Sequence, residues 1–389
     1  MHSREKIAQS IDAAKGEILH LSHQIHEHPE LKFEESFACD LLTRAIRGLG
    51  LEVQAGIAGL PTAFRAEFGA GRGPTVAILA EYDALPNGHS CGHNLIAGAA
   101  LAAAAGLASI RDKLPGRIVL IGTPAEEGGG GKITLLDKGA FRGVDAAMMA
   151  HPYDSEFCSI PALATQHLRL TFHGRAAHAA AAPWDGASAL SAVIQTFQSV
   201  DAARLHLRDG SRVHGIISNG GQAVNIIPEL TQCEFLARAT TSVYAAEIAN
   251  RIVRCAEAAA DATGARMEQQ LIGGYKNMIN NRAMAQLYAR HSAALGTPSP
   301  EAAPGMPTGS TDMGDISHAI PSIHPLFQIS DPGTGNCHED AFVGYADSER
   351  GYAAMIRVAK AMALTAYDLL ADPQALAAAK TEFAGHREK

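Results

Sequence analysis

The length, composition and charge of this chain describe a large globular protein and exclude several functional classes. The chain has 389 residues, of which 47% are hydrophobic and 19% are charged, and its formal net charge is −8 at pH 7. One hydrophobic core seldom supports a chain of this length, so we expect two domains or a domain with a large insertion. The negative charge is spread without a long run of one sign, which argues against binding to nucleic acid or to a membrane.

Targeting and cysteine signals favour a soluble protein of the cytoplasm. Residues 1–18 are polar and lack the apolar core of a signal peptide, and the apolar run at 97–108 is too short to span a bilayer. The cysteines lack the spacing of a disulfide framework; they stand at positions 39, 91, 158, 233, 255 and 337. We therefore expect reduced thiols.

The first part of the chain alternates helical and strand patterns. The continuous apolar runs are typical of strands that are buried on both faces, and Asn94 is a favourable N-cap for the helix that follows it. The expected order is helix 4–27, helix 35–49, strand 74–80, helix 95–113, strand 116–124, helix 132–138 and strand 144–152. This order predicts an α/β domain with a mostly parallel sheet and helices on both faces.

The middle of the chain has a different pattern, in which apolar and polar residues alternate in the strands. Its expected elements are strand 167–174, helix 185–202, strands 212–221 and 229–240, helix 242–264 and a last strand. A β-α-β-β-α-β order, in a sheet with one face exposed to solvent, predicts a small antiparallel α+β domain over 165–272. We expect this domain to be inserted into a larger one made of residues 1–164 and 273–389, with a Pro- and Gly-rich loop at 297–310.

Each of the three apolar strands of the larger domain ends in side chains that bind metals or carry protons. Glu81 and Asp83 follow the first strand, Glu126 and Glu127 follow the second, and His151 ends the third. Ligands of open α/β sheets gather beyond the carboxyl ends of the strands. Three such endings in succession predict a shared metal site.

Cys91 lies in the stretch GHSCGHN, and four functions are open to it: structural thiol, disulfide partner, nucleophile or metal ligand. Its polar, glycine-containing loop and the nearby His93 favour a metal ligand. A nucleophile with His93 as its base is the rival interpretation, but two residues so close in one loop rarely form such a dyad. That interpretation also gives no role to Glu126, Glu127 and His151.

The adjacent carboxylates of Glu126 and Glu127 suit hydrolysis. A hydrolytic metal site needs one carboxylate that holds the ion and a second one that accepts the proton of water. Side chains of neighbouring residues diverge, so two adjacent glutamates can divide these roles. Asp83 is expected to interact with a histidine ligand and to fix the tautomer of its ring.

These motifs and their order resemble the metallopeptidase superfamily of carboxypeptidase G, aminoacylase and the indoleacetyl-amino-acid hydrolases. The stretches that carry the resemblance are IHEHPELKFEE, AEYDALPNGHSCGHN, GTPAEEGGGGK, MMAHP, GRAAHAAAAPWDGASAL, SNGGQAVNIIPE and NCHEDAF. EYDALP, CGHN, AEEGGGGK and GSTDMGDIS are most similar to the B-type branch of the aminobenzoyl-glutamate hydrolases, which includes dipeptidases for β-alanyl peptides.

The resemblance implies a dinuclear metal site with five ligands and one general base. The base would be Glu126, and the ligands would be Cys91, His93, Glu127, His151 and His338. Two divalent ions, zinc or manganese with cobalt as a further choice, would polarise the scissile carbonyl and lower the pKa of a water. Glu81 stands where many relatives carry Asp or His, and Ser310, Thr311 and Asp312 replace an acidic pair, as in the named branch.

The resemblance also implies functions for the inserted domain, as a lid and a dimerisation domain. His178 would donate a hydrogen bond to the oxyanion, and Asn225 and Arg238 would bind substrate. Without the resemblance, His178 reads as a surface histidine and Arg238 as a solvated strand residue.

We predict a metal-dependent amidohydrolase that cleaves N-acyl amino acids or short dipeptides, and the resemblance implies that it acts as a homodimer. The alternative is a non-catalytic or partner-dependent metal-binding chain, because the aminobenzoyl-glutamate hydrolase of this branch uses two unlike subunits.

Overall fold

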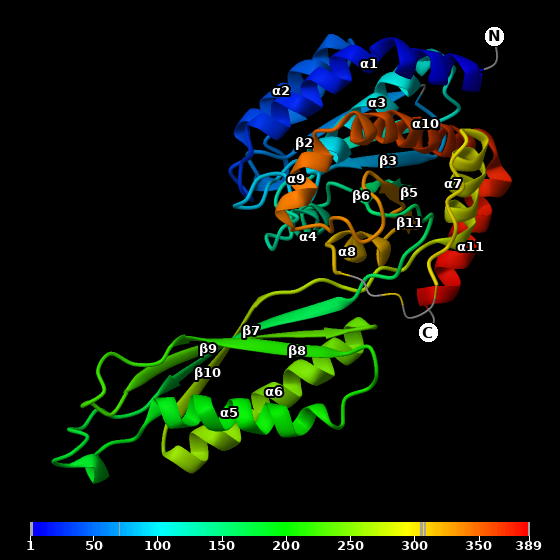
Figure 1. The fold of residues 1–389 in the computed structure, drawn as a ribbon. Helices are drawn as coiled ribbons and strands as arrows, with labels where there is room; N and C mark the ends of the chain where they lie inside the picture. Colours follow the sequence, from blue (N-terminus) through cyan, green and yellow to red (C-terminus); the bar gives the residue numbers. More distant parts are fainter. Residues whose placement is uncertain (1–2, 70, 304–305, 307–308, 388–389) are drawn as a thin grey trace. The chain divides into compact units, whose positions relative to one another are not determined.

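The computed structural model describes residues 3–69, 71–303, 306 and 309–387, which form two compact units (Figure 1). The larger unit contains Met1–Pro161, Met278–Thr308 and Asp312–Lys389, and the smaller one contains Ala162–Asn277 and Gly309–Thr311. Each unit has a hydrophobic core of its own.

The larger unit is built on a six-stranded sheet in the order β1-β2-β4-β3-β5-β11. β3 pairs in parallel with β4 and β5, and β5 pairs in parallel with β11, which confirms the prediction of a largely parallel sheet. β1 and β2 form an antiparallel edge that the sequence analysis did not foresee. The strands are β1 (Val53–Ala55), β2 (Phe64–Gly69), β3 (Thr75–Ala80), β4 (Arg117–Gly122), β5 (Ala146–Met148) and β11 (Ser322–Ile323).

Helices lie on both sides of this sheet, with α1, α2, α3 and α10 on one side and α4 and α8 on the other (Figure 1). Close packing explains the alanine and glycine content of α3: a Cβ on Gly98 would lie 2.3 Å from Met355 Sδ, and one on Gly106 would lie 2.6 Å from Ile11 Cγ1. The helices are α1 (Ser3–Glu27), α2 (Ser36–Gly48), α3 (His93–Ala108), α4 (Gly131–Asp137), α7 (Arg282–Ala294), α8 (Met313–Ser317), α9 (Asp340–Ala346), α10 (Glu349–Ala371) and α11 (Pro373–Arg387).

Two expectations for this unit were wrong. The apolar run at 144–152 is not one strand, because it divides into β5 and β6 (His151–Tyr153), and β6 pairs in parallel with β12 (Leu326–Gln328) in a separate two-stranded sheet. Asn94 does not cap α3. The N-cap is Gly92, whose φ of 71° suits a glycine, and Asn94 Nδ2 instead donates to the carbonyl of Ala346 at 2.9 Å.

The smaller unit is an antiparallel sheet in the order β10-β7-β9-β8, with α5 and α6 against one face (Figure 1). In β9, buried and partly exposed residues alternate, so a single face of that strand is turned to the helices. The elements are β7 (Ala164–His173), α5 (Ala189–Arg204), β8 (Arg212–Asn219), β9 (Leu230–Ala239), α6 (Ser242–Thr263) and β10 (Arg266–Gly273).

Short 3-10 helices complete the secondary structure at Ile57–Gly59, Arg111–Lys113 and Pro183–Asp185. Across the described parts of the chain, none of the helices combines the length and the apolar character that a bilayer-spanning segment needs.

Candidate metal centre

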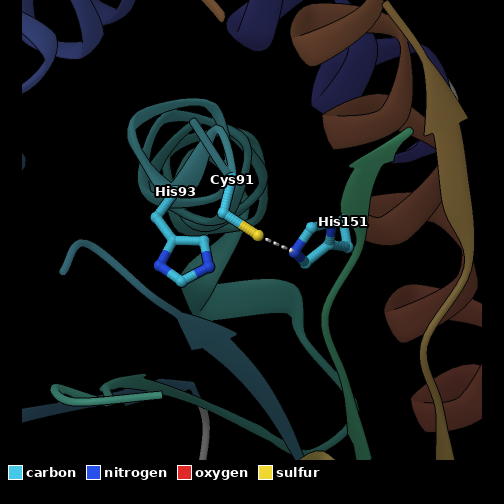
Figure 2. A group of neighbouring side chains, drawn as sticks. All are labelled: Cys91, His93 and His151. Atoms are coloured by element: carbon cyan, nitrogen blue, oxygen red, sulfur yellow. Dashed lines mark hydrogen bonds between the residues drawn. The ribbon is translucent and has the colours of Figure 1, made fainter. Parts of the chain in front are cut away.

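The candidate metal centre lies where the chain leaves β3, β4 and β5, all within the larger unit. Cys91 comes from the loop after β3, His93 begins α3, and His151 begins β6. Figure 2 shows the sulfur of Cys91 pointing toward the ring of His151, with His93 beside it; the Sγ to Nε2 distance is 3.4 Å. The rings of His93 and His151 meet edge to face, with centroids 5.7 Å apart.

Three groups of metal-binding side chains lie here and share members. The donor atoms of each group lie within 4.8 Å of one another; the groups are Cys91, His93 and His151, then Cys91, Glu127 and His338, and finally His93, Glu126 and Glu127. The structure therefore brings together all five predicted ligands and the predicted base. Cys91 belongs to two groups, and overlapping groups fit a pair of neighbouring cations.

Asp83 fixes the orientation of His93. His93 Nδ1 lies 2.9 Å from Asp83 Oδ1, and the other carboxylate oxygen accepts the backbone N–H of Glu127 at 2.9 Å. Burial alone would lower the pKa of His93, but the negative charges of Asp83 and Glu81 outweigh it and raise the pKa. Since Nδ1 is engaged by Asp83, Nε2 is the atom left for a cation.

His151 is oriented by its own backbone neighbourhood. Its Nδ1–H donates to the carbonyl oxygen of Pro152 at 2.7 Å, so the lone pair of a neutral ring is on Nε2, next to Cys91. Burial, followed by the charge of His93, lowers the pKa of His151 to about 4. A histidine that stays neutral at physiological pH is ready to bind a metal without losing a proton.

A strained turn after β4 presents Glu126 and Glu127. Ala125 has a φ of 60°, and a Cβ on Gly131 would lie 1.8 Å from the carbonyl oxygen of Pro124, so this position requires glycine. Burial and then the charges of Glu81 and Glu127 raise the pKa of Glu126 well above its usual value. A carboxylate of raised pKa is a stronger proton acceptor.

Glu127 has the opposite electrostatic surroundings. Its Oε1 lies 3.2 Å from Nε2 of His338, a residue whose φ is 76°. Burial alone would raise the pKa of Glu127, but the imidazole of His338 outweighs it and lowers the pKa. The pKa values of the two adjacent glutamates are therefore shifted in opposite directions, which suits the division of roles that hydrolysis requires.

Orphaned buried atoms provide an independent test of whether the site fits a cation. Nε2 of His93 and Oε2 of Glu81 are buried without a hydrogen-bond partner in the described part of the chain, and they lie 3.6 Å apart. Leaving such atoms unsatisfied costs about 1–3 kcal/mol each. A cation beside them satisfies both, so the residues present fit the metal that this donor set implies.

The sequence analysis missed Lys132, which ties Glu81 to Asp312. The ammonium of Lys132 contacts Glu81 Oε1 and lies 2.6 Å from Asp312 Oδ1, and all three side chains are fully buried. Burial alone would lower the pKa of Lys132, but the two carboxylates raise it. The position of Lys132 directly after four glycines was its only signal, because its partners are remote in the sequence.

Glu35 is a second missed residue. Its buried carboxylate accepts the backbone N–H groups of Phe33 and Ala125, both at 2.8 Å, and the hydroxyl of Thr62 at 2.8 Å. Burial raises its pKa. Glu35 thereby anchors the strained turn that carries the two glutamates, which explains the acidic end of the stretch HPELKFEE.

The residues predicted to bind substrate lie in the smaller unit. His178 and Asn225 belong to adjacent segments, since the N–H of Ala179 donates to the carbonyl of Asn225 at 3.0 Å. His178 is exposed, and its Nδ1 accepts the N–H groups of Ala180 and Ala181 at 3.2 and 3.1 Å. Its proton therefore sits on Nε2.

Arg238 lies apart from these two residues, on β9. Its guanidinium is partly buried and donates to Ser310 Oγ at 2.9 Å. Burial lowers the pKa of Arg238 below its usual value without removing the charge.

Comparisons with known proteins match this site and fold. A model of peptidase family M20/M25/M40 matches residues 77–361. The chain belongs to peptidase family M20. It is 37% identical to the Xaa-Arg dipeptidase of Mus musculus over 398 residues, which cover 98% of this chain and 92% of the mouse protein. It is 32% identical to one of the subunits of the p-aminobenzoyl-glutamate hydrolase of Escherichia coli (strain K12), over 75% of this chain and 65% of that protein.

Solved structures share the fold of this M20 peptidase. A dinuclear metal-binding M20 peptidase from Bacillus subtilis has a TM-score of 0.72 at 21% identity, covering 93% of this chain and 99% of its own. An aminobenzoyl-glutamate utilization protein from Klebsiella pneumoniae has a TM-score of 0.75 at 18% identity, covering 93% and 98%. The predicted family is confirmed, and this M20 peptidase is a metal-dependent enzyme that hydrolyses amide bonds.

Proposed function

We propose that this M20 peptidase hydrolyses the amide bond of short dipeptides and N-acyl amino acids that carry a free carboxylate, with Glu126 as its general base. The observation that carries the proposal is the difference between the two adjacent glutamates, one of raised and one of lowered pKa, beside overlapping groups of metal-binding side chains. The most similar relatives that we compared favour dipeptides with a C-terminal arginine as the first substrates to test.

We assign the metal ligands to Cys91, His93, Glu127, His151 and His338, and the supporting role behind His93 to Asp83. When bound, two divalent cations supply Lewis-acid polarisation of the carbonyl and lower the pKa of water. We infer zinc as the native metal because a thiolate ligand favours it, with manganese as the next choice and cobalt after it.

Glu126 carries the proton through the reaction. Its carboxylate accepts a proton from the attacking water and then delivers it to the nitrogen of the leaving amine. Charge therefore does not accumulate on the water oxygen or on the leaving nitrogen. The raised pKa of Glu126 keeps this carboxylate basic enough for the first transfer, and its burial keeps bulk water from exchanging the proton.

We assign substrate contacts to three residues of the smaller unit. The Nε2–H of His178 is a fixed donor, because Nδ1 accepts two backbone N–H groups, and it suits an oxyanion. The side chain of Asn225 would help to hold the substrate near His178. Arg238 keeps its charge and would pair with the substrate carboxylate.

We also propose a homodimer that forms through the smaller unit, which would then serve as lid and dimerisation domain. β8 is an edge strand, and Ile216 and Ile217 on it are 63% and 44% exposed, with Ile194 of α5 at 45%. Long apolar edge strands are covered in stable proteins. Sedimentation should give a dimer, and Ile216→Asp should shift it to a monomer; a monomeric parent protein contradicts this proposal.

The cysteines support a reducing compartment, which we propose to be the cytoplasm. All six are free thiols. Structural disulfides are common in oxidising compartments and rare in the cytosol.

The substrate proposal is tested with metal-free protein reconstituted separately with Zn²⁺, Mn²⁺ and Co²⁺. Each form is assayed on dipeptides that end in arginine, lysine or alanine, on aminobenzoyl-glutamate and on N-acetyl amino acids. We expect turnover only with metal and highest on dipeptides with a basic C-terminal residue. Activity that persists after a chelator has removed the metal contradicts metal-dependent hydrolysis. Activity that does not depend on added metal but is lost when the cysteines are alkylated contradicts it as well.

A further inference from the structure

Cys337 is a thiol beside the metal centre that the proposed mechanism does not use. The N–H of His338 donates to the carbonyl of Ser90 at 2.8 Å, so the two segments lie side by side, and a cysteine adjoins the bonded residue on each. The thiol of Cys337 lies 3.7 Å from the carbonyl oxygen of Pro152, the same oxygen that orients His151. Cys337 is partly exposed, whereas Cys91 is buried.

The two thiols lie at the same pair of residues: Cys91 Sγ is 3.4 Å from Nε2 of His151, and Cys337 Sγ is 3.7 Å from the Pro152 carbonyl oxygen that His151 Nδ1 bonds. A side-chain hydrogen bond with Cys337, followed by burial, raises the pKa of the Cys91 thiol well above its usual value. A disulfide needs two sulfur atoms that approach without backbone rearrangement. The paired segments, and the position of both thiols at His151 and Pro152, provide that approach.

We propose that Cys91 and Cys337 form a reversible disulfide that competes with cations for the sulfur of Cys91. The competition rests on the proposed function, in which Cys91 is a metal ligand, but the disulfide itself does not. A sulfur atom in a disulfide has no thiolate pair to give to a cation, so oxidation would release metal and stop hydrolysis. Bound metal would, by the same linkage, slow oxidation.

The oxidant is a hydroperoxide such as hydrogen peroxide, and the steps balance. The thiolate of the more exposed Cys337 attacks one peroxide oxygen, breaks the O–O bond and becomes a sulfenic acid. The other oxygen leaves as water or an alcohol after it takes up the proton that the Cys337 thiol lost. The sulfur of Cys91 then attacks the sulfenic sulfur; the S–S bond forms, the S–O bond breaks, and water leaves with the proton of the Cys91 thiol. Two thiols lose two electrons, which reduce one peroxide.

The other buried cysteines lack this reactivity. Burial raises the pKa of Cys39 and Cys233 to about 12 and that of Cys158 to about 11. Oxidation begins at an exposed thiolate, so peroxide does not react first with these buried thiols, nor with the buried Cys91, but with the partly exposed Cys337. Cys255 is partly exposed and serves as the control.

The experiment treats zinc-loaded and metal-stripped protein with hydrogen peroxide and then blocks free thiols with an alkylating agent. We expect a mass decrease of two hydrogen atoms, a peptide that joins Cys91 to Cys337, and zinc release detected with a chelating dye. The metal-stripped protein should form the bridge faster, and dithiothreitol should restore both thiols and zinc binding. Stable sulfinic acid at Cys91, or no bridge at all, overturns the proposal.

Two variants sharpen the test. Cys337→Ser should retain zinc under the same peroxide treatment, and Cys255→Ser should behave like the parent protein. If Cys337→Ser is poorly folded by circular dichroism, Cys337→Ala replaces it. If the protein forms the bridge but cannot be loaded with metal, the disulfide is supported and the proposed function is contradicted. If the zinc-loaded enzyme is active but never forms the bridge, only the disulfide is contradicted.

Discussion

Lys132 and Asp312 form a double link: Nζ of Lys132 lies 2.6 Å from Asp312 Oδ1, and the backbone N–H of Lys132 donates to Oδ2 at 3.0 Å. The same ammonium contacts Glu81, whose other oxygen faces His93. One buried cation therefore joins the start of α4, the end of β3 and the segment before α8. This link holds Glu81 beside the metal centre and offsets part of the charge of two buried carboxylates.

Lys132→Met should strongly destabilise the protein, because it leaves Glu81 and Asp312 as buried charges without a partner. Breaking a buried pair of this kind costs about 3–5 kcal/mol. Urea denaturation of metal-free protein measures the loss. Adding Glu81→Gln and Asp312→Asn should recover part of it, since the uncompensated charges are then gone.

The matched control is Lys380→Met. Lys380 pairs with Asp145, but its side chain is 50% exposed, and an exposed pair contributes about 1 kcal/mol or less. If both variants lose the same free energy of unfolding, the buried position of Lys132 does not make its ion pairs more important for stability than an exposed pair.

Glu126→Gln should lower turnover by about a thousandfold, in the range of general acid–base catalysis with its neighbouring effects. The amide keeps the shape of the side chain but cannot accept the proton. Metal content, measured by mass spectrometry, should stay at the level of the parent protein. Glu257→Gln, on the exposed face of α6, is the control and should leave turnover unchanged. Full activity in Glu126→Gln with metal bound would remove Glu126 as the base.

His178→Ala should leave metal content intact and lower turnover by about a hundredfold, as expected for the loss of an oxyanion donor. The fixed Nε2–H of His178 is the reason for choosing this residue. His206→Ala, another exposed histidine of the smaller unit, should keep full activity. Comparable turnover in the two variants would return His178 to the class of ordinary surface histidines.

Asp368→Asn should lower the free energy of unfolding by about 1.5–3 kcal/mol at neutral pH, because charged hydrogen bonds are lost. The carboxylate lies 2.7 Å from Arg4 Nη2 and 2.8 Å from His291 Nε2, and so joins α10 to α1 and α7. Burial alone would raise the pKa of Asp368, but His291 and Arg4 outweigh it and lower the pKa below 3.8.

The sign of the pH dependence follows from that lowered pKa. The unfolded carboxyl takes up its proton near 3.8 and the folded one only at lower pH, so the stabilisation is complete well above 3.8 and is lost as the pH falls from there through the lower pKa of the folded state. Urea denaturation of both proteins at about pH 7 and about pH 3 should show a smaller difference at the lower pH. A difference that grows on acidification would contradict the assignment of the charge to Asp368.

Several features of the fold could be predicted because they depend on short stretches of sequence. Every residue of TVAILA in β3 is buried, so a continuous apolar run was enough to place a strand between two helical layers. The chemistry of the centre was equally visible, since metal-binding residues followed three strand ends and parallel strands bring such ends together. The pairing of Asp83 with His93 could also be predicted, because one short loop separates the two residues.

Other features were decided only by packing between remote segments. Asn94 has the right side chain for a helix cap, yet Gly92 takes that position and Asn94 bonds to Ala346, far along the chain. The run at 144–152 is mostly apolar, but its second part leaves the main sheet for β12. Apolar periodicity reports burial, whereas it cannot report which strand is the partner.

The sequence by itself determined which residue types could bind metal and move protons, because their chemistry and their places at strand ends are local properties. Only the tertiary structure decided how the charges are balanced. Lys132 pairs with Glu81 and Asp312, and Cys337 lies near Cys91, although long stretches of chain separate these residues. Folding closes the loops between them, and the sequence at either end of such a loop does not indicate its partner. The surroundings of each carboxylate, and hence its charge, depend on burial and neighbours that exist only in the folded chain.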